Sequence, residues 1–131
     1  MRILAREVCF KIIYASMFDG VDNIIEDICD ENKLTQKEDV EFVNEIVSLW
    51  KSNREDIKNI LKQSLVNYDY ERVYKIDLAL LEMAVTEITY YKETAKEIVF
   101  DEIINLSKKY STDKSYRFIN GVLKTVYGEN K

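Results

Sequence analysis

Residues 112–127 read TDKSYRFINGVLKTVY, and the spacing of apolar side chains in this stretch indicates the fold. Apolar residues recur every three or four positions, which places them on one face of an α-helix. They are Ile119, Val122, Leu123 and Val126. The opposite face carries a second stripe of residues, namely Lys114, Arg117, Gly121 and Lys124. The stretch therefore predicts a C-terminal helix with one buried face and one basic face.

Helical spacing recurs along the rest of the chain and predicts six further helices. Three are expected over about residues 3–18, 22–31 and 77–91. Three more are expected to start near residues 36, 53 and 95, where S/T-x-x-E capping boxes occur. In each box the hydroxyl is expected at the N-cap and the glutamate at N3; the hydroxyls belong to Thr35, Ser52 and Thr94.

The scarcity of turn-forming residues supports an all-helical chain. The sequence contains no proline and only three glycines, which argues against a β fold that needs many tight turns. We predict an all-α fold of seven helices in two small bundles, separated by a link near residues 67–76. The length of 131 residues is that of one domain, so residues 1–131 are interpreted as a single domain.

The composition removes several classes of function. The chain has no histidine, so it lacks the usual base of hydrolytic triads and the commonest nitrogen ligand of metals. Cys9 and Cys29 lie too far apart for a C-x-x-C motif and are interpreted as buried, reduced thiols. We therefore predict no catalytic residue, no metal site and no cofactor. Tyr68, Tyr70, Tyr90 and Tyr91 are interpreted as helix-packing residues.

The hydropathy pattern favours a cytoplasmic protein. The longest run without a charged residue is Ile12–Phe18, far below the ~20 residues that a membrane-spanning helix needs. The first residues do not show a signal-peptide pattern. We expect no membrane partner.

Both ends of the chain carry a net positive charge, although the net charge of the whole chain is −5. Residues 1–14 carry a net charge of +2 and residues 108–131 a net charge of +4, whereas residues 15–107 are strongly acidic. If the two ends pack side by side, they form one basic surface that neutralises phosphates, with nearby tyrosines as stacking platforms for bases. The alternative is that these cations only solvate exposed helix faces.

Gly121 lies inside the predicted C-terminal helix, where glycine costs about 1 kcal/mol relative to alanine. Two explanations remain open at this point. Either the backbone of another helix packs closely against this position, which is the favoured interpretation, or a ligand does.

Several segments resemble the NusB family of transcription antitermination factors. Residues 115–123, SYRFINGVL, resemble its S-x-K/R-F-V-N-G-V-L signature, and residues 98–109, IVFDEIINLSKK, resemble its V-x-I-N-E-A-V-E-L-A-K-K segment. Residues 81–88, LEMAVTEI, are similar to its L-R-I-A-x-Y-E-L helix. Residues 5–7 and 12–14 match the A-R-E…x-L-Y pattern of its first helix.

The resemblance implies a fold and a binding role. The fold is seven helices in two bundles, as the periodicity also predicts. The role is binding of the boxA element in RNA of ribosomal RNA operons, jointly with NusE, a small-subunit ribosomal protein. The complex acts indirectly on elongating RNA polymerase, which then reads through terminators. No chemistry is involved, so the chain is not expected to be an enzyme.

The resemblance also assigns residues. The residues expected to contact RNA come from the family pattern and from the basic stripe of the C-terminal helix. They are Arg2, Arg6, Tyr110, Lys114, Arg117, Phe118, Asn120 and Lys124. Contacts to NusE are expected from Tyr14 in the first helix and from Asp77 at the start of the fifth.

Two of the chain's departures from the family pattern change the charge near the expected binding surfaces. The family often has three or four arginines near the first helix, whereas Ile3 and Leu4 stand between Arg2 and Arg6 here. Glu82 stands where the family usually has arginine. These departures motivate an alternative, a helical protein–protein adaptor of the same fold with little RNA binding. The sequence leaves open whether the chain is a monomer or a homodimer.

Overall fold

The computed structural model describes residues 2–19, 24–65 and 68–128. Within these ranges the chain forms seven α-helices and no β-strand, which confirms the predicted all-α fold. The helices are α1 (Ile3–Asp19), α2 (Ile24–Glu31), α3 (Lys37–Ser52), α4 (Arg54–Ser64), α5 (Lys75–Val85), α6 (Lys96–Tyr110) and α7 (Ser115–Tyr127). A 3₁₀ turn, Tyr70–Arg72, precedes α5, and a π-helical segment, Thr86–Tyr91, continues it.

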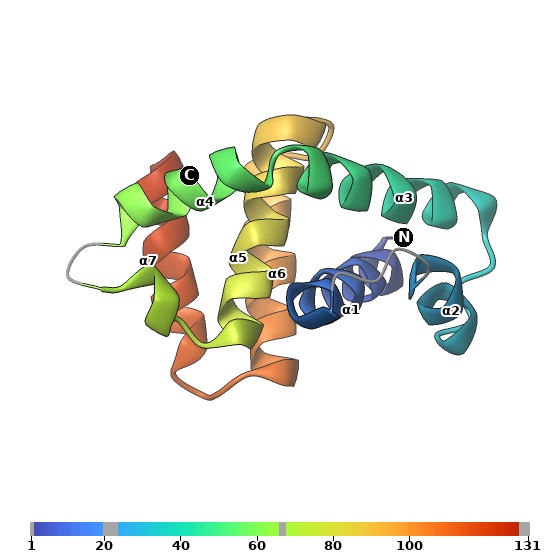
Figure 1. Ribbon diagram of the computed structural model, residues 1–131, viewed down its shortest axis with the longest axis horizontal. Coiled ribbons are helices and arrows are strands. Elements are labelled where there is room, and N and C mark those ends of the chain that lie inside the picture. The colour runs from blue at the N-terminus through green and yellow to red at the C-terminus, as the bar shows by residue number, and fades with distance from the viewer. Residues whose placement is uncertain (1, 20–23, 66–67, 129–131) are drawn as a thin grey trace.

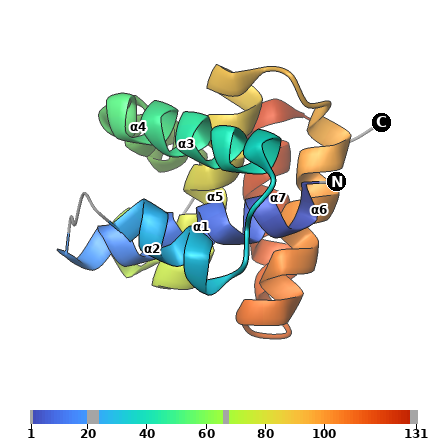
Figure 2. The ribbon, with the colours of Figure 1, turned by 90° about the vertical axis from the view of Figure 1, so that its right-hand side faces the viewer.

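The helices form two bundles that meet along α5 (Figure 1). Helices α1, α2 and α3 make up one bundle, and α4, α5, α6 and α7 make up the other. Helix α1 runs across α5 and α6, and α3 packs against the π-helical segment (Figure 2). The predicted division near residues 67–76 is therefore wrong. The bundles divide between α3 and α4, where Asn53 ends one helix and begins the next.

The predicted capping boxes are also wrong in detail. Helices α3, α4 and α6 each begin one residue later than expected, with Gln36, Asn53 and Ala95 at their N-caps and no capping hydrogen bond from a side chain. Ser52 shows one physical reason: it is the last residue of α3, so its backbone is helical and not in the extended conformation that an N-cap prefers. Packing of the two helices, not local capping, sets this boundary.

Helix α5 is the centre of the molecule. All its residues from Asp77 to Val85 are buried, because α1, α4, α6 and α7 surround it. The apolar stripe that predicts this helix consists of Leu78, Leu81, Ala84, Val85 and Ile88; the first four are buried, Ile88 is only partly buried, and the stripe is only part of the buried surface. The predicted single helix over 77–91 changes character at Thr86, whose hydroxyl donates to the carbonyl oxygen of Glu82 at 2.7 Å.

The two cysteines are buried free thiols, as predicted. Burial raises the pKa of the Cys9 thiol well above its ordinary value. Across the described ranges, no helix has the length and apolar character that a membrane crossing requires. The same ranges contain no group of three or more cysteine and carboxylate side chains arranged to hold a metal ion.

Candidate nucleic-acid interface

The end of α6 and the start of α7 form an exposed basic corner, which we call the α6–α7 basic surface. It is formed by Lys108, Lys109, Lys114, Tyr116 and Arg117. The Lys108 Nζ atom lies 5.1 Å from the centre of the Tyr116 ring, and the Arg117 Cζ atom lies 5.7 Å from it. The Nε atom of Arg117 also donates to the Tyr116 hydroxyl at 3.2 Å. Two cations thus flank one aromatic ring, an arrangement suited to a phosphate beside a base.

Helix α1 holds the end of α6 through Glu7. The Glu7 carboxylate accepts hydrogen bonds from the Tyr110 hydroxyl and from the Lys109 Nζ atom, the latter at 2.7 Å. Burial favours a higher pKa for Glu7, but these hydrogen bonds and the charge of Lys109 outweigh it and lower the pKa. Burial and the Glu7 bond raise the pKa of Tyr110 to about 12. The Tyr110 ring packs on Phe10 with 5.1 Å between ring centres, so one face of Tyr110 is covered.

A shallow groove of about 290 Å³ lies between the end of α4 and the exposed face of α7. Phe118 and Tyr68 form its aromatic wall, with their ring centres 5.0 Å apart. Arg117 and Gly121 also line it. A Cβ atom added at Gly121 would meet nothing within 4 Å. The favoured explanation for this glycine, close packing by another helix, is therefore wrong, and the position is open to a ligand.

The other predicted contacts on α7 lie along the same helix. Asn120 and Lys124 are partly buried, and Lys114 is exposed at the N-cap. Val126 is only partly buried, whereas Ile119, Val122 and Leu123 form the buried face. The helix thus has the two faces that its sequence predicts.

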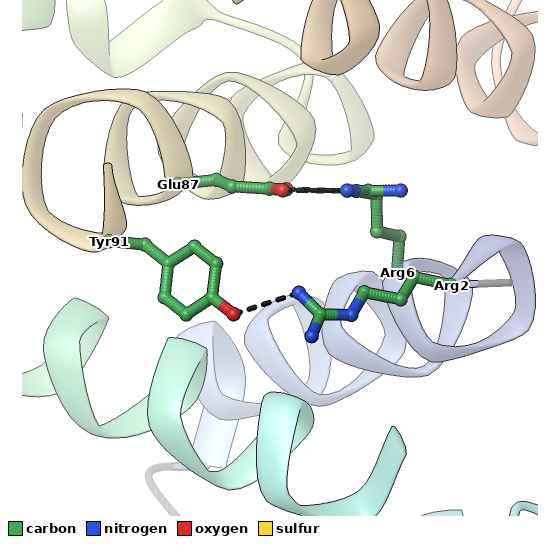
Figure 3. Close-up of polar contacts among 4 residues, drawn as sticks. All are labelled: Arg2, Arg6, Glu87 and Tyr91. Atoms are coloured by element: carbon green, nitrogen blue, oxygen red, sulfur yellow. Dashed lines mark hydrogen bonds and ion pairs between the residues drawn. The ribbon is translucent and has the colours of Figure 1, made fainter. Parts of the chain in front are cut away.

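The two N-terminal arginines lie elsewhere and point inward (Figure 3). Arg6 is 5% exposed, and its guanidinium donates to both carboxylate oxygens of Glu87, with an ion-pair distance of 2.7 Å. Burial favours a lower pKa for Arg6, but the hydrogen bond and charge of Glu87 outweigh it and raise the pKa. Arg2 donates to the Tyr91 hydroxyl at 2.8 Å and lies 4.6 Å from the Phe42 ring centre.

The two chain ends meet at Glu7, Lys109 and Tyr110, but the guanidinium groups of Arg2 and Arg6 are bonded to Tyr91 and Glu87 and do not extend the basic surface of the C-terminal helices. Helices α5 and α6 lie between α1 and α7 in Figure 1, and the side chains of Arg2 and Arg6 are engaged by the π-helical segment. A contact between Arg6 and RNA would first require the Glu87 pair to open. The α6–α7 basic surface therefore does not include the N-terminal arginines.

The two residues predicted to contact a protein partner differ in accessibility. Tyr14 is partly buried, and its ring packs between Phe10 and the 58%-exposed Phe18, at 6.0 and 5.0 Å. Asp77 is 5% exposed and accepts a hydrogen bond from the Ser111 hydroxyl at 2.6 Å. Asp77 thus anchors the turn between α6 and α7, and the exposed aromatic group lies at the end of α1.

Comparison with known proteins identifies the family. The model of the NusB family matches residues 3–128, nearly the whole chain. The chain belongs to the NusB family. Transcription antitermination protein NusB of Finegoldia magna is 35% identical over 124 residues, which cover 93% of this chain and 90% of that protein. NusB of Clostridium novyi is 33% identical over 123 residues, which cover 91% of this chain and 92% of that protein.

Solved NusB structures share the fold. A crystal structure of the antitermination factors NusB and NusE in complex with dsRNA aligns with a TM-score of 0.89 at 26% identity, covering 96% of this chain and 95% of that chain. NusB of T. maritima aligns with a TM-score of 0.86 at 25% identity, covering 99% of this chain and 92% of that chain. The predicted family and its seven-helix fold are thus confirmed.

Within this NusB fold, the structure adds to the candidate site three residues that the sequence analysis did not place there, Tyr68, Lys108 and Lys109. Tyr68 was interpreted as a helix-packing residue, but it is 52% exposed and forms the groove wall with Phe118. It lies between α4 and α5, outside any helix, so helical periodicity could not place its side chain. Lys108 and Lys109 join the basic surface because the turn at residues 111–114 folds α6 back beside α7.

Proposed function

We propose that this chain is an RNA-binding transcription antitermination factor that acts with NusE. The RNA is boxA of ribosomal RNA operons, and the effect is read-through by RNA polymerase in the cytoplasm. The role is binding without catalysis. The observation that carries the proposal is the exposed α6–α7 basic surface with its adjoining aromatic groove, on a chain whose net charge is −5. The similar crystal structure with NusE and dsRNA supports the choice of partners.

The geometry suits single-stranded or unpaired RNA. Lys114 and Arg117 are exposed and present cations to phosphates, while Tyr116 and the groove wall of Phe118 and Tyr68 offer rings on which bases stack. The open position at Gly121 lets a nucleotide approach the α7 backbone. We include Tyr110, Asn120 and Lys124 at the edges of this surface.

The NusE contact is proposed at the end of α1 and the start of α5. The exposed Phe18 ring, packed edge-on against Tyr14, supplies an apolar anchor there. Asp77 lies at the start of α5, where its buried carboxylate accepts a hydrogen bond from the Ser111 hydroxyl and so supports the position of that helix end.

The decisive experiment is fluorescence anisotropy of labelled boxA RNA with and without NusE, at several salt concentrations. Lys114→Glu plus Arg117→Glu should weaken RNA binding and leave NusE binding intact. The slope of log K against log salt is negative, and the loss of two phosphate contacts should make it less steep by about 1.4 for a single strand. The control, Lys33→Glu plus Lys37→Glu, makes the same charge change at exposed positions near the start of α3. Equal losses in both variants would contradict the proposed surface.

The alternative is a helical adaptor that binds NusE but little RNA. The internal engagement of Arg2 and Arg6 favours it, because two cations expected at the RNA are used inside the protein. The adaptor would be favoured if the chain binds NusE but shows no salt-sensitive RNA binding, whether or not NusE is added to the RNA titration.

A further inference from the structure

The contact between α1 and the end of α6 joins the two surfaces that the proposed function uses. Glu7 of α1 has a side chain that is 11% exposed, and its carboxylate accepts hydrogen bonds from the Lys109 Nζ atom at 2.7 Å and from the Tyr110 hydroxyl. The Lys109 side chain is 60% exposed, so its head group is held at Glu7 while the rest lies at the surface. Lys109 belongs to the α6–α7 basic surface, and Tyr110 lies at the edge of that surface.

Three aromatic rings of α1 extend this contact to the proposed NusE anchor. They belong to Phe10, Tyr14 and Phe18, which are spaced four residues apart and therefore lie along one side of the helix. The Tyr110 ring centre lies 5.1 Å from that of Phe10. The Phe10 and Tyr14 ring centres are 6.0 Å apart, and those of Tyr14 and Phe18 are 5.0 Å apart. A continuous series of ring contacts thus runs from the exposed Phe18 to the end of α6, over roughly 12 Å of α1.

Glu7 can aid RNA binding only by orienting its partners, because its charge offsets that of Lys109 and opposes the phosphates. The Lys109 ammonium group has several N–H donors, so the bond to Glu7 leaves others for a phosphate oxygen. The Lys109 Nζ atom also lies 5.4 Å from the centre of the Tyr110 ring, so the two residues form one unit that Glu7 holds. A side chain that is already oriented loses less freedom when RNA binds, and this makes binding tighter.

We propose that Glu7 is a positioning residue that passes the binding of NusE on α1 to the RNA surface on α6 and α7. The proposal rests on the proposed function, in which NusE covers Tyr14 and Phe18. A partner seated on these rings restrains α1, and the Glu7 contact transfers the restraint to Lys109 and Tyr110, which then meet the RNA in a fixed orientation. By linkage, RNA strengthens the binding of NusE by the same factor as NusE strengthens the binding of RNA.

Fluorescence anisotropy of labelled boxA RNA gives the dissociation constant with and without NusE, and the ratio of the two constants is the NusE enhancement. Glu7→Met removes both acceptor oxygens and keeps a similar side-chain volume, so the enhancement should fall about two- to tenfold, the effect of releasing one long side chain. Glu7→Gln removes the same charge but keeps one acceptor oxygen, so it should retain most of the enhancement. The two variants therefore separate orientation from charge.

Lys109→Met and Lys108→Met form a matched pair at exposed positions, where the fold does not depend on the side chain. Each variant removes one cation from the α6–α7 basic surface and should weaken RNA binding. Lys109→Met also cuts the link to Glu7, so it should lower the NusE enhancement as Glu7→Met does. Lys108 lies against the Tyr116 ring instead, so Lys108→Met should leave the enhancement unchanged.

Amide hydrogen exchange with NusE but without RNA tests the link directly. The end of α6 is closed by a hydrogen bond from the Ser111 N–H group to the Ser107 carbonyl oxygen at 2.8 Å. NusE should slow the exchange of amides in this last turn in the parent and in Glu7→Gln, but not in Glu7→Met.

The proposal is overturned if the parent shows no NusE enhancement, if Glu7→Met keeps the parent's enhancement, or if NusE leaves amide exchange at the end of α6 unchanged. Tighter RNA binding by Glu7→Met would also overturn it, because Glu7 would then act only as a counter-charge to Lys109. In all these cases the parent still binds RNA, so the proposed function stands. A parent that binds no RNA under any condition contradicts the proposed function, and the role of Glu7 then falls with it.

Discussion

Replacing Arg6 by methionine tests the ion pair that joins α1 to the π-helical segment. Arg6 and Glu87 have side chains that are 6% and 1% exposed, with three donor–acceptor distances of 2.7, 2.9 and 3.2 Å between them. The methionine side chain occupies most of the volume of the aliphatic part of arginine, but it leaves the Glu87 carboxylate buried without its ion-pair partner. Breaking a buried pair in this way costs about 3–5 kcal/mol of unfolding free energy.

Urea unfolding followed by far-UV circular dichroism measures this loss. With a urea dependence of about 2 kcal/mol per molar, the midpoint should fall by about 1.5–2.5 M. The double variant Arg6→Met plus Glu87→Met removes both charges together and should recover most of the loss, since buried pairs replaced by apolar groups are often close to neutral. Arg2→Met is the control, because Arg2 is less buried and donates to a neutral hydroxyl, and it should cost about 1 kcal/mol.

The same variants separate a structural role of Arg6 from a role at the RNA. If Arg6 acts only inside the protein, the double variant should bind boxA RNA with the parent's affinity and salt dependence. A midpoint shift below about 0.5 M for Arg6→Met, together with weaker RNA binding in the double variant, would refute the reasoning. It would mean that the pair opens readily and that Arg6 reaches the RNA.

Three further predictions concern other sites. Glu7 has a lowered pKa, so its contacts stabilise the fold at pH values above the ordinary glutamate pKa of about 4.3, and this stabilisation is lost as pH falls through the folded-state pKa. The difference in unfolding free energy between the parent and Glu7→Gln should therefore shrink below about pH 4 and stay constant above about pH 5. Gly121→Ala should raise the unfolding free energy by up to about 1 kcal/mol, and a loss of stability would show that the groove is tighter than described. Glu82→Leu leaves the Trp50 and Tyr70 donors unpaired and should cost about 2–6 kcal/mol, whereas Glu82→Gln, which can still accept one hydrogen bond, should cost less in the same urea assay.

The periodic apolar pattern was enough to predict the helices. Helices α3, α4 and α7 each bury a face that their own residues define, so these helices and the buried face of α7 could be predicted without knowing the neighbours, whereas α5 is buried on all sides. The family resemblance rested on motifs spread over nearly the whole chain, of which the one at residues 115–123 is the most specific. The exposure of Lys114 and Arg117 also follows from that local geometry.

Which residues pack against a given helix face depends on contacts between segments that are distant in the sequence, and helical periodicity does not predict those contacts. The partner of Arg6 lies 81 residues further along the chain, so a cation that resembles an RNA contact in the sequence is paired in the interior. Ser52 begins a capping pattern in the sequence but is the last residue of α3 in the structure, with Asn53 at the N-cap of α4. Gly121 faces open space and Tyr68 forms a groove wall for the same reason. Local spacing determines which side of a helix is buried, whereas the docking of helices determines what covers it and which charges remain free for a ligand.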